Sequence, residues 1–134
     1  MSTLDVTGLK SKVALTPTKF YDKDDKEIGT LCRAWVNFNG TGTVAIRASF
    51  NVTSITDNGT GDYTVNFTNA MPDANYCMIG TSGGGSTTTF GNGTFVIEHS
   101  GTARTVNAIR IAPKQANAPT TATDEIFINV AIFR

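Results

Sequence analysis

From Leu31 onward, apolar and polar residues alternate along the chain. In the segment 43–56, the apolar residues that share one face are Val44, Ile46, Ala48, Phe50 and Val52. A period of two is typical of a β-strand with one face on the core and the other in water. The pattern predicts that this segment forms one long strand or two collinear strands.

Short turn signals separate the alternating runs. The pair Asn58-Gly59 favours a tight hairpin turn, and the segment Pro72–Asn75 indicates a second turn. Residues 113–123 are mostly polar and include Pro119, so we expect a polar loop there. No ten-residue segment shows the period of 3.6 that is typical of a helix. The chain is therefore predicted to fold as an all-β antiparallel sandwich or jelly-roll-like domain.

The final run, residues 125–133, is apolar on both of its faces. Ile126, Ile128, Val130 and Ile132 share one face, and Phe127, Ala131 and Phe133 share the other. A strand of this kind is buried on both faces, either centrally in a sandwich or between subunits. The second apolar face predicts that the body associates as a homotrimer, with Phe127 and Phe133 as candidate trimer contacts.

The low charge content and zero net charge of the chain restrict the classes of partner that we expect it to bind. Only 16% of the residues are charged, and eleven basic residues balance eleven acidic ones. A neutral chain has no long-range field to attract nucleic acid or an anionic membrane surface, and no run approaches the ~20 apolar residues of a membrane span. We expect neither nucleic-acid binding nor membrane insertion. A sparsely charged, neutral body tends to associate, which agrees with an obligate oligomer.

The first 29 residues differ from the remainder of the chain. Ten of the 22 charged residues lie within the first thirty positions, mostly in the run Asp22–Glu27. This run alternates in sign and is expected to form a solvated turn. We predict that residues 1–29 form an N-terminal arm or particle-docking segment and that residues 30–134 form the β-sandwich domain. Cys32 and Cys77 are expected to be reduced thiols, made in a cytoplasm.

The sequence offers little for catalysis or metal binding. His99 is the only histidine, and within one chain it cannot build a catalytic triad or a metal site alone. Asp57 and Asp62 flank a loop that superficially resembles a calcium loop, but its spacing does not match and a hairpin turn explains both residues. We expect no enzymatic activity, no catalytic residues, no cofactor and no metal. Trp35 could stack on a sugar, although packing is the preferred interpretation for a strand residue beside Val36.

A glycine-rich segment, Ser82–Ser86, interrupts the strands. It lacks the lysine and the following helix of a phosphate-binding loop. A mobile, exposed tip is the better interpretation, and such tips often carry binding functions. Gly83, Gly84, Gly85 and Ser86 are therefore candidate receptor-contact residues.

Three stretches of this chain resemble one known family. They are RAWVNFNGTG at residues 33–42, VAIRASFNVTSITDNGTGDYTVNFTNAMPDANY at residues 44–76, and the closing INVAIFR at residues 128–134. All three are similar to the small C-terminal β domain of bacteriophage tail-fibre and related appendage proteins. The resemblance implies a homotrimeric part of a phage appendage in the virion, in contact with other virion proteins and with a host-surface receptor or glycan.

About thirty residues precede the part that resembles this family, so we expect a short tail-fibre or spike-type module in place of a long shaft. Two alternatives remain open. The first is a capsid decoration protein, that is, a cement or head-fibre protein. The second is a free carbohydrate-binding, lectin-like domain, although such a domain would more often carry disulfides or clustered exposed aromatic residues.

Overall fold

The computed structural model describes residues 19–84, 94–116 and 118–134, and every regular element in these ranges is a β-strand. The strands, in chain order, are β1 (Lys19–Tyr21), β2 (Glu27–Thr30), β3 (Cys32–Asn39), β4 (Ala45–Phe50), β5 (Val52–Gly59), β6 (Asp62–Phe67), β7 (Cys77–Gly83), β8 (Thr94–Glu98), β9 (Ala108–Gln115), β10 (Ala118–Ala122) and β11 (Phe127–Phe133). The all-β prediction is confirmed. Across these ranges no helix is long and apolar enough to cross a membrane.

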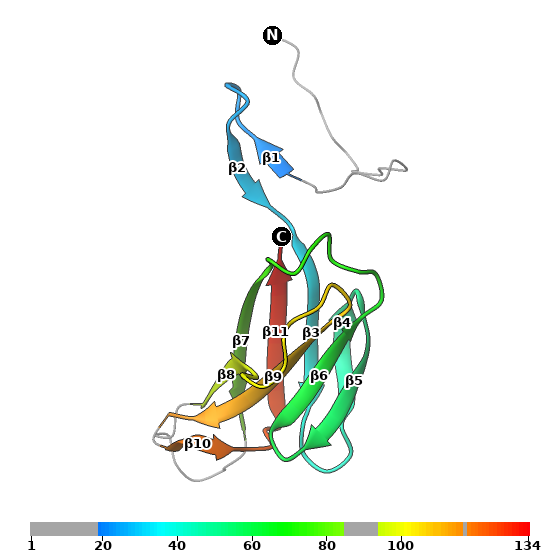
Figure 1. The fold of residues 1–134 in the computed structure, drawn as a ribbon, viewed down its shortest axis with the longest axis vertical. Coiled ribbons are helices and arrows are strands. Elements are labelled where there is room, and N and C mark those ends of the chain that lie inside the picture. The colour runs from blue at the N-terminus through cyan, green and yellow to red at the C-terminus, as the bar shows by residue number, and fades with distance from the viewer. Residues whose placement is uncertain (1–18, 85–93, 117) are drawn as a thin grey trace.

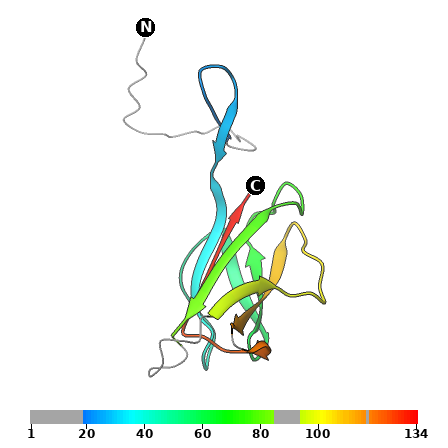
Figure 2. The same ribbon diagram turned by 90° about the vertical axis from the view of Figure 1, so that its left-hand side faces the viewer.

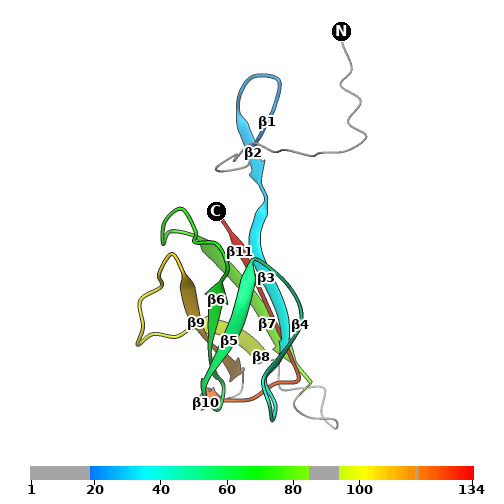
Figure 3. The same cartoon turned by 90° about the vertical axis from the view of Figure 1, so that its right-hand side faces the viewer.

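Nine strands form a single antiparallel sheet that nearly closes on itself. The order along the sheet is β4-β3-β11-β7-β8-β9-β6-β5, and β10 pairs with β9 outside this path. Figure 1 shows β5, β6 and β9 lying across β3 and β11, so that the sheet encloses a core between two layers. The two ends of the order, β4 and β5, follow each other in the chain and lie side by side (Figure 3).

A corner at Asn51 joins β4 to β5. Asn51 has a φ of 55°, in the left-handed region that asparagine tolerates better than most residues. Its side-chain amide donates hydrogen bonds to the carbonyls of Arg33 (3.0 Å) and Asn69 (3.1 Å). The prediction of one long strand or two collinear strands is therefore wrong, because this residue turns the chain from one layer of the sheet to the other.

The core fills the space between the two layers. Its largest fully buried side chains include Phe38 and Tyr63, whose rings meet edge to face at 5.3 Å between centroids. Gly40 passes so close to this cluster that an added Cβ would lie 2.6 Å from the Tyr63 hydroxyl and 2.7 Å from Ile128. No side chain fits there, so glycine is required at this position.

The predicted inward face of residues 44–52 is only partly realised. Val52 is buried and Val44 is half-buried, but Ile46, Ala48 and Phe50 are exposed. An irregularity in the β3–β4 pairing and the corner at residue 51 both break the period of two. As a result β4, the edge strand, has neither face covered within the chain.

Residues 113–123 are not the loop that was predicted. β9 continues to Gln115, and β10 occupies Ala118–Ala122 on the edge of the sheet. Proline is tolerated in edge strands because its missing N–H is not needed for pairing, so Pro119 does not prevent a strand here.

The first two strands form a separate hairpin beyond the body. β1 and β2 pair only with each other, and Figures 1 and 2 show the hairpin standing away from the end of the body where the C-terminus lies. The predicted turn at residues 22–27 is confirmed. The Asp22 carboxylate accepts hydrogen bonds from the backbone N–H groups of Asp24 (2.9 Å) and Lys26 (3.0 Å).

Candidate assembly surface

The outer face of the layer β4-β3-β11-β7 is exposed and rich in apolar side chains. The last strand shows the contrast within two residues: Ile128, on the inner face, is 0% exposed, whereas Phe127, on the outer face, is 50% exposed. The prediction that this strand is buried on both faces does not hold within a single chain. We call the outward side of β4, β3, β11 and β7 the outer face.

One row of apolar side chains crosses all four strands of the outer face. Trp35 on β3 lies opposite Phe50 on β4 and Ala131 on β11, and Ala131 lies opposite Ile79 on β7. Residues directly opposite each other point to the same side of a sheet, so Phe50, Trp35, Ala131 and Ile79 form one continuous row. Of these, Phe50, Trp35 and Ile79 are large and exposed.

The next row along the outer face is polar. Asn37 donates a hydrogen bond to the side chain of Asn129 (2.6 Å), and Asn129 donates to the hydroxyl of Thr81 (3.3 Å). A shallow depression of about 280 Å³ lies between the two rows, lined among others by Trp35, Ile79 and Asn129. The outer face therefore combines an apolar band with a ladder of amides whose mutual bonds are already formed.

The two predicted trimer contacts lie at opposite ends of this face. Phe127 carries the guanidinium of Arg47 over its ring at 4.5 Å from the centroid, a cation–π contact. Phe133 is half-buried and lies in register between Cys32 on β3 and Cys77 on β7. Both cysteines are free thiols. The structure places Phe127 and Phe133 on one surface and does not bring them into contact with each other.

Trp35 contributes to the outer face, which the sequence interpretation missed. It is 41% exposed, so the expected packing role is not fulfilled within one chain. The available signal was the alternation itself, because Trp35 has the opposite parity to the buried Ala34 and Val36. Phe50 was missed for a different reason, namely the irregular pairing between β3 and β4 described above.

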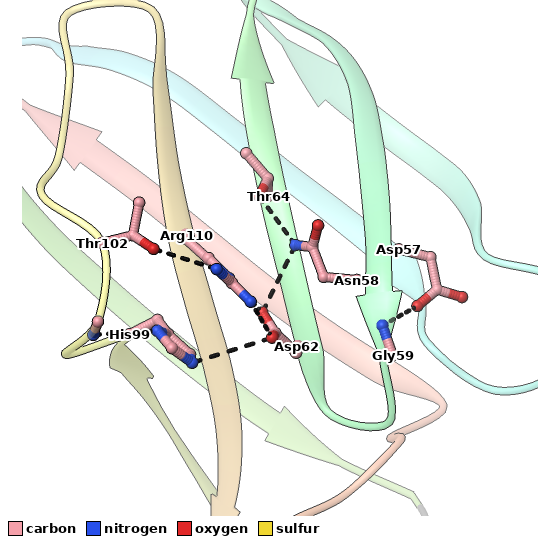
Figure 4. A network of polar contacts seen from close by, with 9 residues as sticks. Asp57, Asn58, Gly59, Asp62, Thr64, His99, Thr102 and Arg110 are labelled. Carbon is pink, nitrogen blue, oxygen red and sulfur yellow. Dashed lines mark hydrogen bonds and ion pairs between the residues drawn. The ribbon is translucent and has the colours of Figure 1, made fainter.

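The opposite layer presents a polar surface instead. Figure 4 shows a network centred on the Asp62 carboxylate, which accepts hydrogen bonds from Arg110 (2.7 Å from Nε to Oδ1) and lies 3.9 Å from Nε2 of His99. The hydrogen bonds from Arg110 lower the pKa of Asp62 below its usual value. The Asn58 side-chain amide donates hydrogen bonds to the Asp62 carboxylate and to the Thr64 hydroxyl. These bonds connect the β5–β6 hairpin to the network.

The residues of the supposed calcium loop are engaged within the chain. Asp57 accepts the backbone N–H of Gly59 at 2.9 Å, as expected for a hairpin turn, and Asp62 holds Arg110. In residues 19–84, 94–116 and 118–134, no three side chains of the His, Cys, Asp or Glu type gather as a metal site. Burial and the neighbouring Asp124 carboxylate raise the pKa of the Tyr63 hydroxyl, so that Tyr63 remains a hydrogen-bond donor to Asp124.

The glycine-rich candidate loop is only partly described. Gly83 ends β7, and Gly84 follows with a φ of 90°. A Cβ at Gly84 would lie 3.1 Å from Ile126 and from the Phe127 ring, so this end of the loop borders the outer face. Gly85 and Ser86, the other two predicted receptor-contact residues, lie outside the described residues.

Comparison with known proteins gives no relative from which a function could be transferred: no protein-family model matches the chain, and neither does any curated protein or solved structure at a significant level.

Proposed function

We propose that this chain is a structural module of a bacteriophage particle, a short homotrimeric tail-fibre or spike-type part that takes part in host attachment. The single structural observation that supports it is the outer face, where Trp35, Phe50, Ile79 and Phe127 are exposed on one side of the sheet. Contiguous apolar surface of this kind marks an interaction site in a soluble protein. The resemblance of residues 33–76 and 128–134 to phage appendage domains supplies the kind of assembly.

A non-catalytic role agrees with how the carboxylates are used. Glu98 pairs with Arg104, Asp73 pairs with Arg134 at 2.7 Å, and Asp62 pairs with Arg110. Hydrolysis of a sugar chain would need two carboxyl groups facing each other across a cleft, with one of them desolvated and protonated. Pairing with arginine instead holds the pKa of Asp62 and of Asp73 below the usual range. We therefore propose a binding and structural role, without cofactor or metal.

The loop that follows β7 is the proposed receptor-contact end. Gly83 and Gly84 lie at the end of the body opposite the β1–β2 hairpin (Figure 1). A module that holds the particle by the hairpin end would thus present Gly83 and Gly84 outward, toward a host receptor or glycan.

The position of the protein on intact particles tests the proposal. Antibody labelling followed by electron microscopy should mark the tail or its tip, and shortening the loop by removing Gly84 and Gly85 should slow adsorption to the host while incorporation is kept. Labelling of the capsid surface alone, with adsorption unchanged by the shortened loop, would contradict an attachment role.

A capsid decoration protein is the second candidate, favoured by one observation. The β1–β2 hairpin extends beyond the body as an arm, and an arm of this kind can anchor a small protein on a capsid lattice. In that case truncation of the arm should abolish incorporation, and capsids lacking the protein should lose stability while adsorption remains normal.

A further inference from the structure

The β1–β2 hairpin is unusual because it is both isolated and apolar. Two strands of three and four residues form its whole sheet, and a single two-stranded hairpin is at best marginally stable in water. Its large apolar side chains are nonetheless exposed: Phe20, Tyr21, Ile28 at 64%, and the adjoining Leu31. The hairpin therefore needs a surface to cover it. We call the β1–β2 hairpin with Leu31, residues 19–31, the arm.

The chain carries a surface of matching character in its outer face. The apolar row formed by Phe50, Trp35, Ala131 and Ile79 offers an area on which the apolar side chains of an arm can pack. Both surfaces are exposed in the isolated chain, and each would remove the other from water.

The charges of the two surfaces are also complementary. The arm carries four carboxylates, all in its turn at residues 22–27, against three lysines, a net charge of −1. Among the outward side chains of β3, β4, β7 and β11 there are two arginines, Arg33 and Arg47, and no carboxylate. An acidic arm and a basic outer face attract each other and disfavour contact between two outer faces.

The connection between arm and body prevents docking within one chain. Only Leu31 separates the end of β2 from the start of β3, so the arm continues in the direction of β3 and away from its own outer face (Figures 1 and 3). A hydrogen bond from the Thr30 hydroxyl to the carbonyl of Arg134 (3.2 Å) further fixes the base of the arm. An arm that docks on this outer face must therefore come from another copy.

We infer that the arm of each copy packs on the outer face of the next copy, around the row Phe50–Trp35–Ala131–Ile79. Such a contact joins two different surfaces, and head-to-tail contacts of this type close into a ring when the rotation between copies permits. This inference deepens the proposed function, because it rests on the proposed self-association and assigns the surfaces that produce it.

Two variants of the full chain test the pairing. The arm variant is Tyr21→Ser with Ile28→Ser, and the face variant is Trp35→Ser with Phe50→Ser. All four side chains are exposed, so each variant should keep the wild-type circular dichroism spectrum. Sedimentation velocity should show that either variant weakens self-association by about thirtyfold or more. Thr56→Ser, at an exposed position of β5 in the opposite, polar layer, is the control and should associate like the wild type.

Mixing the two variants gives the decisive measurement. The intact arm of the face variant can dock on the intact outer face of the arm variant, so a mixed species should form although neither variant associates alone. If the mixture stays dissociated, or if the arm variant associates like the wild type, the arm-on-face contact is wrong. If the arm variant associates like the wild type and only the face variant dissociates, the copies associate through their outer faces without the arm. A wild-type chain that is monomeric at high micromolar concentration would instead overturn the proposed self-association itself.

Discussion

The two layers of the sandwich both consist of antiparallel strands, but their outward side chains are polar on one layer and largely apolar on the other. Over β5, β6 and β9 the outward positions hold threonine, asparagine and the Asp62–Arg110 ion pair, with hydrogen bonds between neighbours. Over β4, β3, β11 and β7 the corresponding positions hold Trp35, Phe50, Ile79 and Phe127. One chain thus contains both a polar surface whose side chains bond to one another and an apolar surface left exposed, and the proposed self-association would cover the apolar one.

The largest expected effect is the loss of folding when a charge is placed on the inner face of β11. Ile128→Asp places a carboxylate in a fully buried position without a partner, which should cost several kcal/mol and abolish folding. Circular dichroism and thermal melting measure the loss. Asn129→Asp, one residue on and on the outer face, is the matched control and should fold. A folded Ile128→Asp variant would show that the core assignment is wrong.

Charged substitutions at the two predicted trimer contacts should affect stability less but should weaken assembly strongly. Phe127→Asp and Phe133→Asp add charge to the outer face, where a contact surface would have to desolvate it. We expect association to weaken by about 2 kcal/mol or more while the melting temperature of the monomer changes by only a few degrees. Phe133 is half-buried, so its variant should lose somewhat more stability than that of Phe127.

Sedimentation equilibrium at several concentrations separates the two readouts. Thr56→Ser again serves as the control for shortening an exposed side chain on the opposite layer. If both phenylalanine variants associate like the wild type, Phe127 and Phe133 are not subunit contacts, and any contact on the outer face is confined to the apolar row between them.

The alternation of the sequence predicted much of this architecture because the period of two is a local property. The inward set on β11, the hairpin turn at residues 57–62 and the turn at 22–27 were read from neighbouring residues alone. The corner at Asn51 was not, because its conformation is fixed by hydrogen bonds to Arg33 and Asn69, each 18 residues away in sequence. Local sequence propensity does not report contacts between residues that are distant in the chain.

The candidate site shows the same limit. Phe127 and Phe133 could be chosen because β11 is apolar on both faces, which is visible in the sequence. Trp35 and Phe50 join them only through the register of β3 with β4 and β11, and register depends on tertiary pairing. Buried Glu125, whose carboxylate accepts the hydroxyl of Thr123 at 3.1 Å, also escaped notice, since carboxylates next to a loop are usually solvated.

On the polar surface we expect a moderate effect from Asp62→Asn. The change removes the charge that pairs with Arg110 and should cost about 1 kcal/mol of unfolding free energy, with no change in association. Asp24→Asn is the control, because the Lys23–Asp24 pair is almost fully exposed and such pairs contribute little. Chemical denaturation at pH 7 measures both.

The same variant predicts a pH dependence. Arg110 lowers the pKa of Asp62 in the folded chain, so the unfolded chain binds more protons near the usual carboxyl value of 3.8. The stability from this pair is therefore fully present above that pH and is lost as the pH falls through the lowered pKa. Asp62→Asn should lose less stability than the wild type between pH 4 and pH 2. Parallel curves for the two proteins over this range would show that the ion pair contributes nothing.

The smallest expected effect is that of a chelator on either surface. The Asp57 carboxylate is used by the backbone of Gly59, and the Asp62 carboxylate is used by Arg110, so neither is available to a cation without breaking an existing bond. A structural metal stabilises the folded state by its binding free energy, and its removal would lower the melting temperature by many degrees. We expect EDTA to leave the melting temperature and the association constant of the chain unchanged. A decrease of several degrees that calcium reverses would reveal a ligand set completed between copies, and the polar surface would then be a second contact surface.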